Sequence, residues 1–408
     1  MTAHARDYDY ACEGRSGEEA MWWLLLTQEG YEDYGESDHT RTMATLLLDI
    51  RKCFDTTGCD QIWRWGRHHG FPHVILRMVL LTFELPRRLV AEGSFGRRVQ
   101  TSWAMVAGSC FSIALLHAMM LTPCDTLVRN MGNLQGVQVG VMKYVDDLTI
   151  TVEGPLRLCR DAVWKAFDEV KTRFSDLGWA LSLNKETAQG KTVALTTNTA
   201  LAEMLQKPAG RRGVRVVQHA RGLGVDLSAR ESRVRASVQV KRARAVNARK
   251  AKIRWATKHG GETRKVGRGG LTPQATYGMK CLMATPQERE KVRAAVNFTE
   301  VGKTHSCSRT LMLAAGGLDP THDMLSAPLF MWACVVWEHG VVPKARLAWL
   351  RHRDTTSWEE VRGPAASVSM ITQELGWRWP DPGVFYTRDG YRVDLKHVAP
   401  RDVQRQAR

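Results

Sequence analysis

The feature of this sequence that most constrains its fold is an acidic pair, Asp146-Asp147, with alternating apolar residues on both sides. Valines occupy every second position from 137 to 141, and apolar residues alternate with threonines from 148 to 152. A period of two on both sides of a short turn is typical of two neighbouring antiparallel strands. The sequence therefore predicts a β-hairpin that carries Asp146 and Asp147 at its tip.

A second carboxylate follows a short apolar run. Residues 44–50 read ATLLLDI, with Asp49 near the end, and they show no helical periodicity, so we predict a buried strand. A carboxylate at the end of such a strand is costly unless a cation meets it. If this strand lies beside the hairpin, Asp49 and Asp146 converge, and their oxygens suit a pair of Mg²⁺ or Mn²⁺ ions that clamp an in-line phosphoryl transfer. The alternative is an ordinary solvated turn.

Both helices and strands are predicted along the rest of the chain. Helices are predicted over 60–69, 72–83, 109–121 and 156–177, a hairpin over 87–99, and short strands over 179–183 and 192–196. The apolar stretch Trp103–Leu121 is interrupted by polar residues. We therefore interpret it as a buried helix and expect no membrane partner.

The cysteines and the first residues of the chain indicate a compartment. The nine cysteines are scattered and include no C-x-x-C pair, which argues against a disulfide framework or a zinc ribbon. The first twenty residues lack the basic flank and apolar core of a signal peptide. We expect reduced thiols and a nuclear or cytoplasmic location rather than secretion.

Positive charge is concentrated in one segment. Between Lys207 and Arg268 the chain carries 19 Lys and Arg against three acidic residues, a surplus as large as the +16 of the whole chain. Residues 228–258 contain no helix breaker and are predicted to form one long basic helix. Such a helix would follow nucleic-acid phosphates without reading bases; the alternative is a solvated face or a nuclear-localisation patch. The candidate phosphate-binding residues are Lys241, Arg242, Arg244, Arg249, Lys250 and Lys252.

Five short motifs, in order, resemble those of reverse transcriptases in the form typical of non-LTR, LINE-like retrotransposons. L-L-L-D-I-R-K-C-F-D at 46–55 resembles motif A, A-G-S-C-F-S at 107–112 motif B, and Y-V-D-D at 144–147 motif C. G-W-A-L-S-L-N-K at 178–185 resembles motif D, and R-G-L-G-V at 221–225 motif E. The resemblance implies an RNA-directed DNA polymerase.

The resemblance also implies catalytic roles. Asp49 and Asp146 would bind two Mg²⁺ or Mn²⁺ ions, with Asp147 as the weaker ligand. Lys185 would neutralise or protonate the pyrophosphate leaving group. The alternative for Lys185 is a solvated lysine in a loop.

Substrate contacts are implied for five further residues. Phe54 would be a steric gate that excludes the ribonucleotide 2′-OH by clash. Arg51 and Lys52 would contact the triphosphate, and Gly108 would let the backbone approach the base pair closely. Tyr144 would pack under the primer terminus.

The implied fold belongs to the α+β class. It is a right-hand polymerase palm, an antiparallel sheet backed by helices, with reduced fingers, a helical thumb and a helical C-terminal region. Only 48 residues precede Asp49, so the fingers are expected to be truncated. The expected divisions are 1–43 for a lead-in and fingers remnant, 44–205 for the palm with a small fingers insertion, 206–270 for the basic thumb, 271–375 for the helical region and 376–408 for a polar tail.

The expected activity is transfer of nucleotides from dNTPs to the 3′-OH of a DNA primer on an RNA template, by a protein derived from a retroelement. Ala107 and Cys110 stand where the family carries Gln and Pro, which weakens the template-side contacts. A catalytically silent nucleic-acid-binding protein that keeps the palm is therefore the alternative. A template-dependent RNA polymerase is less favoured, because those usually carry Gly-Asp-Asp and lack a bulky residue such as Phe54. No pattern indicates an oligomeric state.

Overall fold

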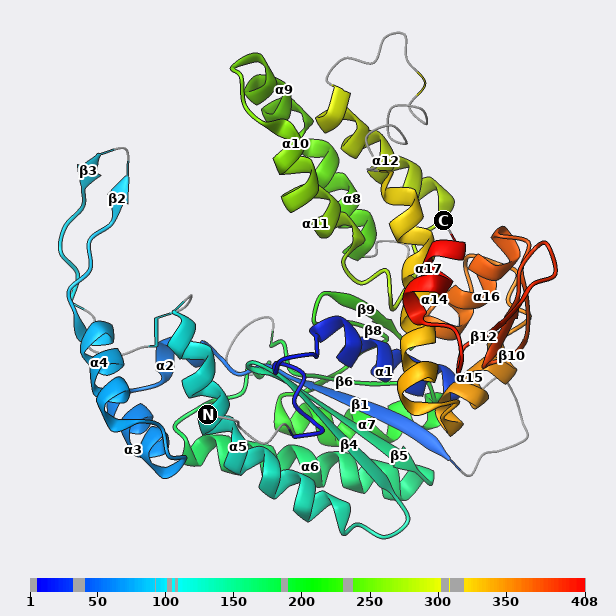
Figure 1. Ribbon diagram of the computed structural model, residues 1–408. Coiled ribbons are helices and arrows are strands. Elements are labelled where there is room, and N and C mark those ends of the chain that lie inside the picture. The colour runs from blue at the N-terminus through cyan, green and yellow to red at the C-terminus, as the bar shows by residue number, and fades with distance from the viewer. Residues whose placement is uncertain are drawn as a thin grey trace. The chain divides into compact units, whose positions relative to one another are not determined.

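The computed structural model consists of two compact units (Figure 1). The first combines Met1–Ser16 with Gly35–Val217, and the second combines Gly17–Tyr34 with Gln218–Arg408. Helices and strands are mixed in both, which confirms the predicted α+β class. The residues that the structure describes are 6–31, 41–91, 93–100, 105–106, 109–184, 190–229, 238–301, 308 and 319–407.

The first unit contains the acidic residues predicted from the sequence. Its strands are β1 (Thr42–Leu48), β2 (Val90–Ala91), β3 (Ser94–Phe95), β4 (Gln138–Tyr144), β5 (Asp147–Gly154), β6 (Val193–Thr196) and β7 (Arg215–Val216). Its helices are α2 (Cys53–Thr56), α3 (Cys59–His68), α4 (His73–Glu84), α5 (Cys110–Gly132), α6 (Leu156–Asp176) and α7 (Thr199–Arg212).

The second unit is mostly helical. Its helices are α1 (Gly17–Gly30), α8 (Val238–Ala248), α9 (Lys250–Lys258), α10 (Thr263–Val266), the π-helical turn η1 (Gly267–Leu271), α11 (Thr272–Thr276), α12 (Pro286–Val301), α14 (Pro320–His339), α15 (Pro343–His352), α16 (Pro364–Glu374) and α17 (Pro400–Gln406). Its strands are β8 (His219–Gly222), β9 (Val225–Ser228), β10 (Arg378–Asp381), β11 (Val384–Tyr386) and β12 (Arg392–Asp394).

Five strands of the first unit form a mixed sheet in the order β4-β5-β1-β6-β7. The central strand, β1, pairs antiparallel with β5 and β6, and Leu46 lies opposite Ile150 on one side and Ala194 on the other. β4 pairs antiparallel with β5, and β7 joins β6 in parallel. All of β1 is buried, so the predicted buried strand beside the predicted hairpin is confirmed.

Helices α5, α6 and α7 cover one face of this sheet (Figure 1). Because side chains alternate along a strand, Leu46 and Leu48 of β1 point into the core under these helices. Phe167 of α6 and Met119 of α5 pack in the same core. Asp49, the next residue, therefore falls on the opposite face of the sheet.

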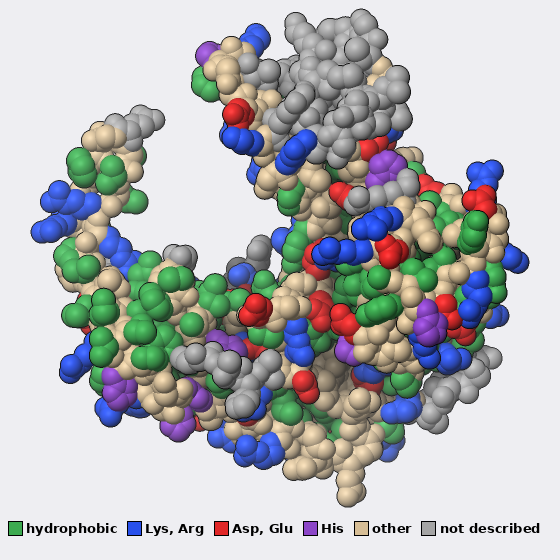
Figure 2. Space-filling view, viewed as in Figure 1, with side chains coloured by type: hydrophobic (Ala, Val, Ile, Leu, Met, Phe, Trp, Pro, Cys, Tyr) green, Lys and Arg blue, Asp and Glu red, His purple; other side chains and the backbone are tan. Residues whose placement is uncertain are grey.

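Apolar side chains are exposed on the segment between β1 and α5. Helix α4 buries Leu76, Val79 and Phe83 on one side. Its other side and the β2–β3 hairpin carry apolar surface, drawn in green in Figure 2. The most exposed members are Val74, Met78, Leu81, Leu89 and Phe95. Apolar surface of this kind is typical of contact surfaces.

Helix α5 extends the predicted helix at 109–121. The Ser109 side chain caps its first turn, and the helix continues through Pro123 to Gly132. Among the described residues, α5 alone is long and apolar enough to cross a membrane by length and composition, and half of that apolar stretch is buried.

The strand predicted over 179–183 is not formed. The segment makes one isolated bridge, between Leu181 and Ile50, and the Ser182 N–H donates to the Asp49 carbonyl at 2.8 Å. The reason is that β6 already occupies this edge of β1. The segment therefore pairs only with the residues that follow β1.

The single basic helix predicted over 228–258 is also wrong in extent. Ser228 ends β9, and the helical part is split into α8 and α9. The Asp226 carboxylate accepts a hydrogen bond from the Val238 N–H at 2.6 Å, so α8 is capped at this point. Residues 230–237 lie outside the described residues.

The polar tail predicted over 376–408 is a packed part of the second unit. Strands β10, β11 and β12 form an antiparallel sheet, and α17 follows them. Phe385, Leu395 and Val403 are fully buried. The core positions in this segment are sparse and show no period, so the sequence pattern did not reveal them.

Helix α1 packs within the second unit, although residues 1–43 were expected to belong to the fingers. The Trp22 ring of α1 lies 6.0 Å from the Trp332 ring of α14, which in turn lies 4.9 Å from the Trp379 ring. Burial of these large aromatic surfaces explains why α1 joins this unit.

Replacing Glu29 of α1 with Ala is expected to lower the free energy of unfolding by about 2 kcal/mol. The buried Glu29 carboxylate accepts the Ala365 N–H at 2.8 Å and the Ala366 N–H at 3.0 Å, in the first turn of α16. Its loss leaves both donors without this acceptor. Urea denaturation measures the effect, with the exposed Glu338→Ala as the control. Equal losses in the two variants would contradict the capping role.

Candidate active site

The acidic pair lies at a tight turn between β4 and β5. Tyr144 and Asp147 are the last facing residues of the two strands, so Val145 and Asp146 form a two-residue loop. Val145 has a φ of 57°, in the left-handed region where glycine is the usual residue of such loops. A β-branched residue here stores about 1–2 kcal/mol of backbone strain. The turn therefore needs support from its surroundings.

The sheet brings Asp49 to this turn. The last pair of β1 and β5 joins Leu48 to Leu148, so Asp49 lies opposite Asp147 one position further on. Neighbouring strands are about 4.8 Å apart. The register of β1 with β6 likewise places Lys191 opposite Asp49, and Lys191 Nζ lies 3.3 Å from Asp49 Oδ1. The convergence of the acidic side chains that was predicted from the sequence is present.

The carboxylates repel one another. Loss of hydration, followed by the negative charges of Asp146 and Asp49, raises the pKa of Asp147 to about 6. Burial and the charge of Asp49 also raise the pKa of Asp146. Lys191 acts in the opposite direction, but its side chain is 73% exposed, so solvent screens its charge. The cluster is short of positive charge, which favours binding of a cation.

The donor set fits a hard divalent cation. Asp49, Asp146 and Asp147 offer only carboxylate oxygens, the ligands that Mg²⁺ and Mn²⁺ prefer. No group of three or more His, Cys, Asp and Glu in the described part of the chain is arranged as a complete metal site. Mg²⁺ usually takes its remaining ligands from water and substrate phosphates. The cluster therefore fits a site that substrate completes.

Four further predicted residues lie within five positions of Asp49 or Asp146 in the chain. Tyr144 is half-buried and faces Asp147 across the hairpin. Phe54 of α2 is half-buried against the core of the first unit, and its carbonyl accepts the Met105 N–H at 2.9 Å. Arg51 and Lys52 are exposed just past β1. The other two, at positions 108 and 185, lie outside the described residues.

Lys191 was not predicted as a site residue. It lies just before β6, in a segment without a motif, and it is separated from Asp49 by more than 140 positions. Only the pairing of β1 with β6 places it beside the cluster. The signal in the sequence was a lysine two residues before a strand, which is too common to be informative.

The predicted phosphate-binding residues of the second unit differ in their surroundings. Lys241, Arg244 and Lys252 are exposed. Arg242 is half-buried, donates to the Tyr277 carbonyl at 2.8 Å and lies 4.7 Å from the centre of its ring. Burial, followed by the charge of a neighbouring arginine, lowers the pKa of Arg242. Arg242 thus holds α8 in place rather than presenting its charge to solvent.

The remaining two of these residues lie around the break between α8 and α9. Arg249 donates a hydrogen bond to the Gln274 side chain at 2.5 Å. Its side chain is exposed, so its positive charge remains accessible to a phosphate. The side chain of Lys250 lies outside the described residues.

Comparison of the chain with models of known protein families gave no match, and comparison with curated proteins gave none. An assignment of function to this protein therefore depends on the chemistry of its own residues. The acidic cluster is the part of the described structure with the clearest chemistry.

Proposed function

We propose that this protein is a reverse transcriptase-like, RNA-directed DNA polymerase that extends a DNA primer on an RNA template. The observation that carries the proposal is the carboxylate cluster: Asp49 at the end of β1, beside Asp146 and Asp147 at the β4–β5 turn. The sheet with helices on one face supports a polymerase palm, because the acidic row lies at the end of the sheet, on the face opposite these helices.

The residues of the cluster would have different roles in metal and substrate binding. Asp49 and Asp146 would supply most of the oxygen ligands, and Asp147 would be the weaker ligand. Bound Mg²⁺ or Mn²⁺ would lower the pKa of the primer 3′-OH and neutralise charge on the pyrophosphate. The Lys191 ammonium lies 3.3 Å from Asp49 Oδ1 and would attract the triphosphate.

Primer extension tests the proposal. The intact chain is incubated with poly(rA)–oligo(dT), dTTP and either Mg²⁺ or Mn²⁺. Elongation of the primer is expected. Binding of the duplex without elongation in either metal would reject the polymerase and leave the silent nucleic-acid-binding protein. Extension only with UTP would indicate an RNA polymerase instead.

Replacing Phe54 with Ala is expected to reduce discrimination against ribonucleotides at least about tenfold. The side chain is half-buried against the core, five residues after Asp49, and in the proposed active site its removal would open space where a 2′-OH would clash. The ratio of kcat/KM for dTTP and UTP measures the effect. Thr56→Ala, at an exposed position of the same helix, is the matched control. An unchanged ratio would remove the gate role of Phe54.

Charge reversal at Lys241 and Lys252 is expected to weaken binding of an RNA–DNA duplex and to flatten its salt dependence, by about one unit of slope for each residue. Both side chains are exposed, so their contribution is electrostatic. Titrations at several salt concentrations measure it. The control carries the same charge change at exposed Lys396 and Arg401. Equal losses in both variants would indicate only a general charge effect.

A further inference from the structure

The last residues of β4 are fastened by the N-terminal segment 6–12. The Lys143 N–H donates to the Tyr8 carbonyl at 2.7 Å, and the Tyr10 N–H donates to the Lys143 carbonyl at 2.9 Å. Asp9 and Lys143 thus form a parallel bridge at the edge of the sheet. The segment touches β4 immediately before the acidic turn.

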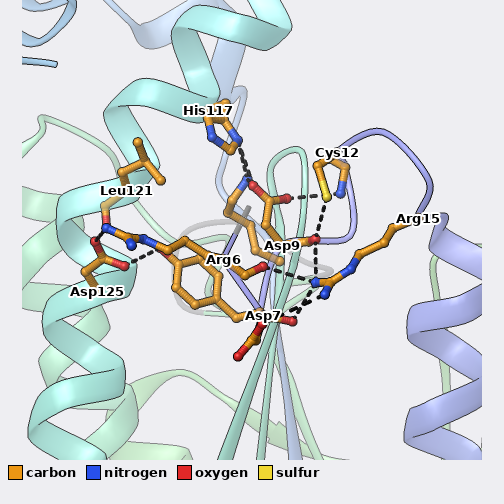
Figure 3. A network of polar contacts seen from close by, with 11 residues as sticks. Arg6, Asp7, Asp9, Cys12, Arg15, His117, Leu121 and Asp125 are labelled. Carbon is orange, nitrogen blue, oxygen red and sulfur yellow. Dashed lines mark hydrogen bonds and ion pairs between the residues drawn. The ribbon is translucent and has the colours of Figure 1, made fainter. Parts of the chain in front are cut away.

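The same two residues form a buried ion pair. Lys143 Nζ lies 2.9 Å from Asp9 Oδ2, and both side chains are inaccessible to solvent. His117 of α5 places its Nδ1 2.7 Å from the same oxygen, and Figure 3 shows it approaching Asp9 from the helix. A buried ion pair offsets the loss of hydration only if its hydrogen-bond geometry is good, and removal of one partner leaves an unpaired buried charge that destabilises the fold. The pair therefore ties β4, the N-terminal segment and α5 together.

A second set of contacts fixes the segment itself (Figure 3). Asp125 of α5 accepts hydrogen bonds from Arg6 at 2.8 Å and from the Tyr8 hydroxyl at 2.7 Å. The Arg15 guanidinium donates to three carbonyl oxygens of the segment, at 2.8–3.2 Å. The segment is therefore anchored to α5 as well as to β4.

The ion pair and the acidic row lie on opposite faces of the same strand. Lys143 faces Leu148 of β5, on the face covered by helices, whereas Tyr144 faces Asp147 on the opposite face. The strained Val145 follows two residues after Lys143. A strained turn persists only where the residues on either side of it are fixed by the surrounding structure. The Asp9–Lys143 ion pair fixes the end of β4, on one side of this turn.

We propose that Asp9 and Lys143 form a clamp that holds the acidic hairpin in the geometry its carboxylates need to bind a divalent cation. They are positioning residues, since neither lies on the face of the sheet that carries the carboxylates. The importance of the clamp for catalysis rests on the proposed function. Its effect on the geometry of the hairpin is independent of that function.

The test uses Mn²⁺ as the probe and the full chain. Asp9→Asn is expected to weaken Mn²⁺ binding about tenfold and to speed amide hydrogen exchange in residues 138–147. Asp7→Asn is the matched control, because Asp7 is a fully exposed acid in the same segment. The control is expected to change neither quantity. Unchanged Mn²⁺ affinity and exchange in Asp9→Asn would overturn the clamp.

The double variant Asp9→Asn with Lys143→Met separates positioning from folding. It removes the charge that Asp9→Asn leaves unpaired, so it is expected to regain thermal stability. Its Mn²⁺ affinity is expected to stay low. Recovery of Mn²⁺ affinity together with stability would show a purely structural pair and would overturn the proposal.

A third variant distinguishes failure of the clamp from failure of the proposed function. Wild-type protein is expected to bind Mn²⁺ more tightly than Asp49→Asn. Equal binding by the two would reject the metal site itself. In that case the exchange data still decide the clamp: faster exchange in Asp9→Asn alone supports it, and equal rates in all variants overturn it.

Discussion

Asp146→Asn is expected to reduce primer extension by about 10²–10³-fold or more, while the affinity for an RNA–DNA duplex stays within a factor of about two. The substitution removes one charged oxygen ligand from the cluster of Asp49, Asp146 and Asp147 and keeps its shape. It also removes a negative charge that, together with loss of hydration and the charge of Asp49, raises the pKa of Asp147 to about 6. The variant is therefore expected to melt no lower than the wild type.

Steady-state extension, duplex binding and thermal unfolding measured on the same preparations check this prediction. Asp161→Asn is the control, because Asp161 is an exposed carboxylate of α6 in the same unit. Equal extension by wild type and Asp146→Asn would dismiss metal catalysis at this cluster. A large loss of melting temperature would instead show that Asp146 stabilises the turn.

Asp9→Asn is expected to lower the free energy of unfolding of the first unit by about 3 kcal/mol at neutral pH. The substitution leaves the Lys143 ammonium buried without a counter-charge. Urea denaturation measures the loss, and the additional change Lys143→Met is expected to recover part of it. Asp7→Asn is expected to cost less than about 0.5 kcal/mol. A loss in Asp9→Asn as small as in Asp7→Asn would refute the buried pair.

The same pair makes stability depend on pH in a defined direction. Burial alone would raise the pKa of Asp9, but the hydrogen bond from His117 and the charge of Lys143 outweigh it and lower the pKa to about 2. Because this value lies below the ordinary value of 3.8, the stabilisation is present above about pH 4 and is lost as the pH falls toward 2. Cys124 of α5 also interacts with Asp9, and burial raises its pKa to about 12, so it stays neutral in this range.

Denaturation of wild type and Asp9→Asn between pH 5 and pH 2.5 checks the direction. The difference in free energy of unfolding is expected to be constant down to about pH 4 and to shrink below it. A difference that grows as the pH falls would contradict the assigned charge state of Asp9.

The acidic hairpin is a feature that the local sequence pattern predicts. The strands around Asp146 follow from a period of two, and their turn follows from the acidic pair between them. The split between α3 and α4 follows in the same way from glycine and proline near position 71. These features depend on residues close together in the chain, so the sequence by itself determined them.

Long-range register was decided only by the tertiary structure. The placement of Lys191 opposite Asp49 depends on which strand borders β1, and the pairing of Asp9 with Lys143 joins segments more than 130 residues apart. Helix α1 joins the second unit because its tryptophan packs with others far along the chain. Such contacts depend on the burial of whole surfaces against each other, and no local period records which surfaces will meet.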